Sequence, residues 1–318
     1  MIVYVMSYFN RLNPFSELLP HSHYNTPFLL EKLLFKLSKK WIAGYDIDDA
    51  LSCALNANER GLKCIINYLG EDFKNPEIVK NTVIEYSKLI NKMRSKNVLG
   101  SVSIKPTQIG LSIDFNFCLN HLLEIISVAK KNLIFIWIDM ESFETVEPTL
   151  SIYQKVFEET NEIGIVLQSY LKRSYSDLTK LLKYDANIRL VKGAYYENEE
   201  NAYQRKSEIA NNYLEMVKLL FLQNKNIRQN QIFAIATHDS NIIEKSLNLF
   251  SLSDLKKEHM QFQFLKGIRD KLKMNLLDRG FTVGEYIPYG ENWLPYSLRR
   301  IRERKSNILL LMRSLISS

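Results

Sequence analysis

The stretch LIFIWIDM, residues 133–140, decides the fold that we expect for this chain. Every position from Leu133 to Ile138 is apolar, so a strand formed here has two apolar faces. Such a strand suits a parallel sheet that helices cover on both sides. The run ends at a carboxylate, Asp139, which indicates that the strand emerges from the core at that point.

Seven further short apolar runs lie along the chain, and longer amphipathic stretches separate them. They span residues 62–71, 100–106, 164–170, 188–195, 232–239, 260–267 and 283–290. Asp46, Asn75 and Asp114 stand where intervening helices are expected to begin, and Gly61 and Gly280 stand where helices are expected to end. Eight strand–helix repeats over about 250 residues predict an α/β fold, a (β/α)8 TIM barrel.

The residues beyond the needs of the barrel are mostly N-terminal. We expect a helical segment over residues 1–45 that packs on a catalytic barrel over residues 46–318. Within the segment, an apolar stripe at helical spacing is interspersed with four lysines; it comprises Leu30, Leu33, Leu34, Leu37 and Trp41. The stripe predicts a core-facing helix, with a membrane or partner surface as the alternative. The apolar C-terminus, SNILLLMRSLISS, leaves the same two interpretations.

The composition is that of a globular protein: of 318 residues, 46% are apolar and 24% are charged. The net charge of +7 arises from 42 basic and 35 acidic residues without a charged tail, so nucleic acid is not expected as a partner. Cys53, Cys64 and Cys118 form no CxxC pair, and no metal site is expected. Neither a signal peptide nor a spanning run is evident, so we expect a cytoplasmic protein.

Polar and charged side chains stand at the ends of most of the predicted strands. They are Lys105, Asp139, Gln168, Arg189, Lys192, Tyr195, Thr237, His238, Asp239 and Tyr286. Each alone fits a loop residue that meets water. Because the active site of such a barrel lies at the C-terminal ends of its strands, the set together predicts a pocket for an anionic ligand. Arg189 and Lys192, three residues apart in an extended strand, are expected to point to opposite faces.

The segment YSLRRIRER, residues 296–304, predicts a helix with one polar face. Tyr296, Arg299, Arg300 and Glu303 share that face at helical spacing. A guanidinium pair matches the two oxygens of a carboxylate or phosphate. The alternative is a basic surface helix or a patch for nucleic acid.

Five motifs together resemble the proline dehydrogenase family: SIKPTQIG, VLQSY, RLVKGAYYE, ATHD and YIPYGENWLPYSLRR..E. They occur in the order typical of the family, from about residue 44 to residue 304. The resemblance implies a distorted (β/α)8 barrel with a final helix over its mouth. It also implies an FAD-dependent enzyme that oxidises L-proline to Δ1-pyrroline-5-carboxylate and passes electrons to a quinone, with peripheral membrane contact.

The resemblance also implies roles for individual residues. Asp139 and Arg189 are expected to be catalytic. The substrate-binding residues implied are Lys105, Arg299 and Arg300 for the carboxylate, Tyr195, Leu265, Tyr286 and Tyr296 around the ring, and Glu303 to hold the arginines. The cofactor-binding residues implied are Met140, Gln168, Arg189, Val191, Lys192, Gly193, Ala194, Thr237 and His238. Asn67 and Tyr196 depart from the family's usual residues, an acid and a tryptophan.

Two other functions stay open on the sequence. In the first, Lys192 is the Schiff-base nucleophile of a barrel aldolase, because a desolvated lysine can attack a carbonyl. In the second, residues 299–305 and the lysine-rich stretch at 28–42 form a basic module that binds nucleic acid or a membrane surface.

Overall fold

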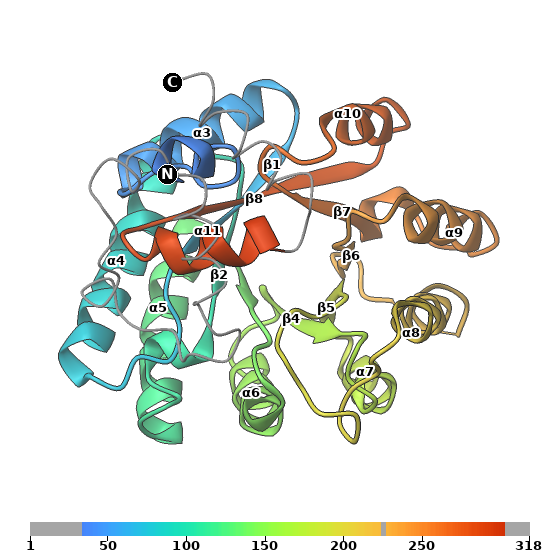
Figure 1. Ribbon diagram of the computed structural model, residues 1–318, viewed down its shortest axis with the longest axis horizontal. Coiled ribbons are helices and arrows are strands. Elements are labelled where there is room, and N and C mark those ends of the chain that lie inside the picture. The colour runs from blue at the N-terminus through green and yellow to red at the C-terminus, as the bar shows by residue number, and fades with distance from the viewer. Residues whose placement is uncertain (1–33, 224–226, 303–318) are drawn as a thin grey trace, which may run out of the picture.

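Eight parallel strands close into a barrel in the order of the sequence, from β1 to β8 (Figure 1). The strands are β1 (Lys63–Tyr68), β2 (Gly100–Ile104), β3 (Phe135–Ile138), β4 (Ile163–Gln168), β5 (Asn187–Val191), β6 (Phe233–Ile235), β7 (Met260–Leu265) and β8 (Thr282–Tyr289). The structure is a computed structural model that describes residues 34–223 and 227–302. Each of the eight apolar runs contains one strand or all but its first residue, so the predicted barrel is confirmed.

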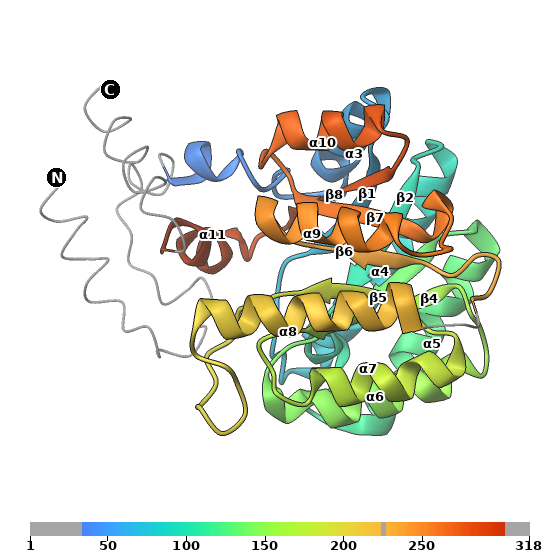
Figure 2. The ribbon, with the colours of Figure 1, turned by 90° about the vertical axis from the view of Figure 1, so that its right-hand side faces the viewer.

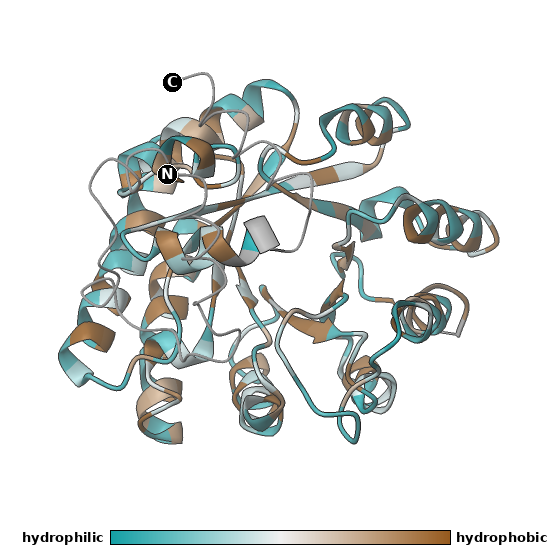
Figure 3. Cartoon of the chain, viewed as in Figure 1, coloured by the Kyte–Doolittle hydropathy of each residue, from teal (hydrophilic) through white to brown (hydrophobic). Residues whose placement is uncertain are grey.

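Helices alternate with the strands along the chain, and all but the last of them surround the barrel (Figure 1). They are α3 (Ile47–Glu59), α4 (Pro76–Ser95), α5 (Phe115–Asn132), α6 (Phe143–Phe157), α7 (Ser174–Leu181), α8 (Lys206–Lys218), α9 (Ser240–Ser251), α10 (Asp270–Asp278) and α11 (Trp293–Arg302). Hydropathy varies around each outer helix, with apolar and polar residues on different sides (Figure 3). The apolar sides of these helices bury the outer face of the sheet.

The predicted helix starts are confirmed by side-chain capping. Asp46 accepts a hydrogen bond from the amide of Asp49, and Asn75 accepts one from Glu77, at 2.9 and 2.8 Å. Asp114 caps α5 in the same way. These bonds satisfy amide groups that have no partner within the helix. The sequence therefore sets each of these strand-to-helix boundaries locally.

Alternate residues of the strands point into the barrel, and the residues between them point to the helices. In β3, Trp137 packs inside with Ile65 and Ala234, whereas Ile136 and Ile138 belong to the outer core. Both faces of the opening stretch are thus buried, as its unbroken apolar run predicts. A Cβ atom on Gly164 of β4 would overlap the Trp137 ring, so this glycine makes room for the indole.

The last helix lies at one end of the barrel, apart from the surrounding ring (Figure 2). It packs against the described part of the N-terminal segment in a cluster of Leu34, Trp41, Ile42, Leu69, Trp293, Leu294, Tyr296 and Leu298. The indole Nε1 of Trp41 donates a hydrogen bond to Ser297 Oγ at 3.2 Å. The stripe is therefore core-facing at Leu34 and Trp41, whereas Leu30 and Leu33 lie outside the described residues. The domain boundary at residues 45 and 46 stays a prediction.

The three cysteines are free thiols, and burial raises the pKa of Cys64 and of Cys118 to about 12. Residues 34–223 and 227–302 contain no group of acidic, histidine and cysteine side chains that could hold a metal ion. In the same ranges, every helix is too short or too polar to cross a membrane.

The fit between Gly164 and Trp137 can be tested by stability. Gly164→Ala places a methyl group against the indole, and overpacking of a filled core destabilises by about 1–3 kcal/mol. We expect urea to unfold this variant at a lower concentration than the wild type. Combination with Trp137→Phe, which has a smaller ring, is expected to recover part of the loss. Strictly additive effects of the two substitutions would contradict the steric explanation.

Candidate active site

A cavity of about 830 Å³ opens at the C-terminal ends of the strands and is lined in part by α11. Its volume lies in the range of small-molecule and cofactor sites. The predicted site residues that line it are Lys105, Asp139, Met140, Gln168, Arg189, Val191, Lys192, Gly193, Ala194, Tyr195, Thr237, His238, Leu265, Tyr286, Tyr296 and Arg300. Of the remaining two, the side chain of Arg299 and the whole of Glu303 lie outside the described part of the chain.

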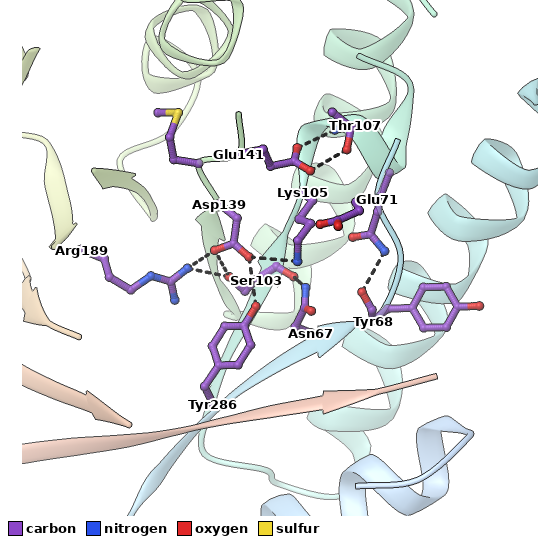
Figure 4. Close-up of polar contacts among 12 residues, drawn as sticks. Asn67, Tyr68, Glu71, Ser103, Lys105, Thr107, Asp139, Glu141, Arg189 and Tyr286 are labelled. Atoms are coloured by element: carbon purple, nitrogen blue, oxygen red, sulfur yellow. Dashed lines mark hydrogen bonds and ion pairs between the residues drawn. The ribbon is translucent and has the colours of Figure 1, made fainter. Parts of the chain in front are cut away.

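Asp139 is the centre of a polar network that joins four strands (Figure 4). Its Oδ1 accepts hydrogen bonds from Arg189 and from Ser103 Oγ, the latter at 2.8 Å. Its Oδ2 accepts a hydrogen bond from the hydroxyl of Tyr286 at 3.0 Å and lies 3.9 Å from Lys105 Nζ. The carboxylate directly follows β3, and its partners come from β5, β2 and β8. Asp139 therefore fixes the relative positions of two cations and a phenol at the cavity.

Arg189 lies deep in the barrel, with only 2% of its side chain exposed. Besides Asp139 it donates to Ser103 Oγ at 2.7 Å and to Gln263 Oε1 at 3.2 Å. Its guanidinium carbon lies 5.0 Å from the centroid of the Trp137 ring, within the range of a cation–π interaction. A buried arginine needs such partners, because an uncompensated charge in the interior is strongly unfavourable.

The Tyr286 hydroxyl stays protonated over a wide range of pH. Burial, together with the charge of Asp139, raises the pKa of Tyr286 well above its ordinary value, although Arg189 acts in the opposite direction. The hydroxyl is thus a permanent donor to Asp139 Oδ2. The face of the same ring lies against Arg189, 5.7 Å from its guanidinium carbon.

Lys192 lines the same cavity as Arg189, contrary to the expectation of opposite faces. The reason is that β5 ends at Val191, so strict alternation stops one residue before Lys192. Lys192 Nζ forms an ion pair with Asp239 Oδ2 at 2.6 Å. The hydrogen bond from Lys192 lowers the pKa of Asp239, which also caps α9. The lysine is therefore held by Asp239 beside the start of a helix.

Gln168 presents an acceptor among the residues that line the cavity. Its Nε2 donates to the carbonyl oxygens of Met140 and Glu141, at 2.8 and 2.7 Å. These two bonds set the orientation of the amide, and its Oε1 is buried without a partner among the described residues. A buried acceptor of this kind indicates a ligand that donates a hydrogen bond.

Gly193 adopts a φ of +107°, a conformation that side chains disfavour. A Cβ atom at this position would also overlap the ring of Tyr170. The positive φ and the contact with Tyr170 therefore each require glycine here, whether or not a ligand approaches the backbone.

Helix α11 contributes Tyr296 and Arg300 to the cavity. The guanidinium carbon of Arg300 lies 5.4 Å from the centroid of the Tyr296 ring, which holds the cation against the aromatic face. Both side chains lie on the polar face that the sequence predicts for this helix. Arg300 and Lys105 thus supply positive charge to one cavity from distant parts of the chain.

Several cavity residues do not appear in the prediction from sequence. They are Val166, Lys206, Ala236, Ser240, Asn241, Gln263, Phe264 and Arg269. Arg269 Nε donates to the carbonyl of His238 at 3.1 Å, and Lys206 begins α8. Both cations lie where a loop that follows a strand leads into the next helix, so charged residues at such positions are the signal that could have found them. Nothing local marks Gln263, which is one of two glutamines within β7.

Two acidic residues near Lys105 are also missed by the sequence reasoning (Figure 4). Glu71 Oε2 accepts a hydrogen bond from the Tyr195 hydroxyl at 2.9 Å. Glu141 is 3% exposed and accepts two hydrogen bonds from Thr107. Burial raises the pKa of Glu141 to about 7, although the charge of Lys105 lowers it.

Comparisons with known proteins agree with this geometry. The family model for proline dehydrogenase matches residues 50–310. Proline dehydrogenase 1 of Bacillus subtilis is 32% identical over 279 residues, which cover 88% of this chain and 90% of that protein. Proline dehydrogenase of Deinococcus radiodurans is 30% identical over 293 residues, which cover 91% of this chain and 93% of that protein.

Solved structures share the fold. The chain is similar to proline utilization A from Bdellovibrio bacteriovorus, with a TM-score of 0.80 and 23% identity. The match covers 86% of this chain and 33% of that much longer one. Proline utilization A from Bradyrhizobium japonicum is similar with a TM-score of 0.71 and 19% identity, over 86% of this chain and 31% of that one.

Fold and cavity define a barrel enzyme with a cation-lined site at the C-terminal ends of its strands. The family match and the sequence identity to the two bacterial relatives specify the family to which this barrel enzyme belongs. The chain belongs to the proline dehydrogenase family.

The buried carboxyl of Glu141 predicts a dependence of stability on pH. Because its pKa rises from 4.5 to about 7 on folding, the folded chain binds the proton more tightly than the unfolded chain. The contribution of this group to the free energy of unfolding is therefore greatest below pH 4.5 and decreases as the pH rises to 7. As the pH rises from 4.5 to 7, the free energy of unfolding of Glu141→Gln is expected to increase by up to about 3 kcal/mol relative to that of the wild type. No further increase is expected above pH 7.

Urea unfolding of the two proteins at several pH values measures this difference. Glu77→Gln, which removes an exposed carboxylate near the start of α4, is the control and is expected to show a much smaller change. If the free energies of unfolding of Glu141→Gln and the wild type differ by the same amount at pH 4.5 and at pH 7, the raised pKa of Glu141 is contradicted.

Proposed function

We propose that the cavity at the mouth of the barrel is the active site and that FAD is the cofactor. The chain is a proline dehydrogenase and oxidises proline to Δ1-pyrroline-5-carboxylate. The observation that carries the proposal is the gathering of Lys105, Arg189, Lys192 and Arg300 around one cavity whose carboxylates, Asp139 and Asp239, are fewer. Such a site has a surplus of positive charge for an anionic substrate and an anionic cofactor.

Lys105 and Arg300 are proposed to bind the carboxylate of proline together with Arg299. Lys105 is held near Asp139, and its side chain is only 11% exposed, so an anion that meets it there is largely removed from water. The rings of Tyr195, Tyr286 and Tyr296 and the side chain of Leu265 line the cavity and would surround the pyrrolidine ring. Glu303 is proposed to orient the arginine pair from the next turn of the helix.

The residues present fit a flavin cofactor. Gln168 Oε1 is a buried acceptor without a partner among the described residues, and it suits the imide N–H of a flavin ring. Residues proposed to hold the cofactor are Met140, Gln168, Arg189, Val191, Lys192, Gly193, Ala194, Thr237 and His238. Lys206 and Arg269, which line the same cavity, add cations suited to phosphate groups. When bound, FAD would supply the acceptor for the hydride that leaves the substrate.

The chain's own residues prepare the site for this reaction. Asp139 holds Arg189 and the Tyr286 hydroxyl, so these groups need no rearrangement when a ligand enters. Arg189 is positioned to stabilise negative charge in the floor of the cavity. Helix α11 lines the cavity with Tyr296 and Arg300, and it would limit access of water to the bound substrate.

Neither alternative function is favoured by a specific observation. A Schiff-base lysine needs its nitrogen free to attack a carbonyl, whereas Lys192 Nζ is bound to Asp239 Oδ2 at 2.6 Å. A quinone-type electron acceptor, with contact at a membrane surface, is part of the proposal and follows from the family resemblance. A cytoplasmic location likewise stays a prediction.

The visible spectrum of the purified protein tests class, cofactor and substrate together. We expect the absorbance bands of an oxidised flavin, and we expect anaerobic proline to bleach them. Acid release of the cofactor and its chromatography then distinguish FAD from FMN. A colourless protein that borohydride links covalently to a carbonyl compound would instead favour the aldolase.

Removal of one cation tests the carboxylate site. Lys105→Ala and Arg300→Ala are each expected to raise the KM for proline at least tenfold, because loss of one partner of a buried ion pair is worth about 2–5 kcal/mol. The flavin content per chain is expected to stay unchanged. Lys131→Ala, which removes an equal charge from the exposed end of α5, is the control. Unchanged saturation by proline in both cavity variants would remove the proposed clamp.

A further inference from the structure

Glu141 is a buried carboxylate that the proposed reaction does not use. It lies two residues after Asp139, and its side chain turns toward Thr107 near Lys105 (Figure 4). The amide of Thr107 donates to Oε2 at 3.0 Å, and the hydroxyl of Thr107 donates to Oε1 at 2.6 Å. Both carboxylate oxygens are therefore bound to a single residue of a different rim segment.

Thr107 connects this carboxylate to Lys105 and to a third segment. It lies two residues after Lys105, in the short 3-10 turn Pro106–Ile109 that follows β2. Its hydroxyl also accepts a hydrogen bond from the amide of Asp72 at 2.8 Å, and its carbonyl accepts one from Phe73 at 3.1 Å. Glu141 thereby joins the segments that follow β1, β2 and β3 at the place where Lys105 leaves its strand.

We propose that Glu141 is a positioning residue for substrate binding: its ionised carboxylate fixes the turn at Thr107 and so places Lys105 for the carboxylate of the substrate. This inference rests on the proposed function, in which Lys105 binds that carboxylate. Glu141 acts only through Lys105, and it needs no contact with the substrate.

The hydrogen bonds favour the ionised form of Glu141. Both of its oxygens face donors of Thr107, and the Thr107 hydroxyl already accepts from Asp72. A proton on Oε2 would place a second donor against the Thr107 amide and break that bond. A proton on Oε1 would reverse the bond to the Thr107 hydroxyl, whose own proton would then lose this acceptor. Protonation is therefore expected to loosen the turn that carries Lys105.

The surroundings of Glu141 make this protonation relevant near neutral pH. The titratable groups that face it are Lys105 after β2, Glu71 after β1, Tyr86 on α4 and Cys118 on α5. Burial raises the pKa of Tyr86 and of Cys118, so both stay neutral. Since the pKa of Glu141 lies at about 7, the affinity for an anionic ligand is expected to fall as the pH decreases through that value.

Binding of tetrahydrofuran-2-carboxylate to the holoenzyme, measured by calorimetry across this pH range, tests the inference. This probe has the ring size and the carboxylate of proline but no amine that titrates. For the wild type we expect the dissociation constant to rise about fivefold or more from above to below the pKa of Glu141. Glu141→Gln is expected to bind about as weakly as the wild type at low pH, and without a step.

A second pair of variants covers the case in which Glu141→Gln does not fold. Thr107→Val removes the hydroxyl at nearly constant volume and is expected to weaken binding about fivefold, whereas Thr107→Ser, which keeps it, is expected to restore affinity. Ser112→Ala removes a different hydrogen bond to the same loop, that to Asp72 Oδ1 at 2.6 Å, and serves as the matched control.

A double-mutant cycle separates this inference from the proposed function. In a Lys105→Met background, Glu141→Gln or Thr107→Val is expected to have no further effect on binding of the probe. An undiminished effect in that background, or a pH step that survives in Glu141→Gln, would overturn the positioning role. If Lys105→Met alone leaves the dissociation constant unchanged, the carboxylate clamp itself fails.

Discussion

The ion pair between Asp139 and Arg189 inside the barrel is the interaction on which the rest of the site depends. A guanidinium that is almost completely buried requires a counter-charge, and one carboxylate oxygen supplies it. The same carboxylate also binds Ser103, Tyr286 and, more distantly, Lys105. Removal of Asp139 would therefore leave a buried cation without compensation and release the groups proposed to meet the substrate.

Apolar packing beneath this pair determines where it can stand. Trp137 fills the barrel two residues before Asp139, and Gly164 on the next strand leaves the space that its ring occupies. Arg189 lies over that ring, so the indole forms a floor under the guanidinium. The stretch that predicts the fold, residues 133–140, thus also places the functional carboxylate. Its Trp137 ring supports the Arg189 guanidinium, and its Asp139 carboxylate neutralises the charge of that guanidinium.

The mouth of the barrel is completed by parts of the chain that are distant in sequence. Trp41 from the N-terminal segment packs with Trp293 and Leu298 of α11, and this cluster holds the helix that brings Arg300 to the cavity. Elsewhere at the mouth, Thr107 and Glu141 join the segments that follow the first three strands near Lys105. The two cations proposed to bind one carboxylate are thus held by different kinds of contact, one apolar and one polar.

The sequence by itself determines the eight strands, the capped helix starts at Asp46, Asn75 and Asp114, and the strand-end positions of Lys105, Asp139 and Gln168. These features depend on local periodicity and on hydrogen bonds between residues close in the chain. Only the tertiary structure decides that Asp139 meets Arg189, that Lys192 joins the same cavity and pairs with Asp239, and that Glu141 faces Thr107. Those pairings depend on the register of distant strands and on where each strand stops, and no local pattern encodes either.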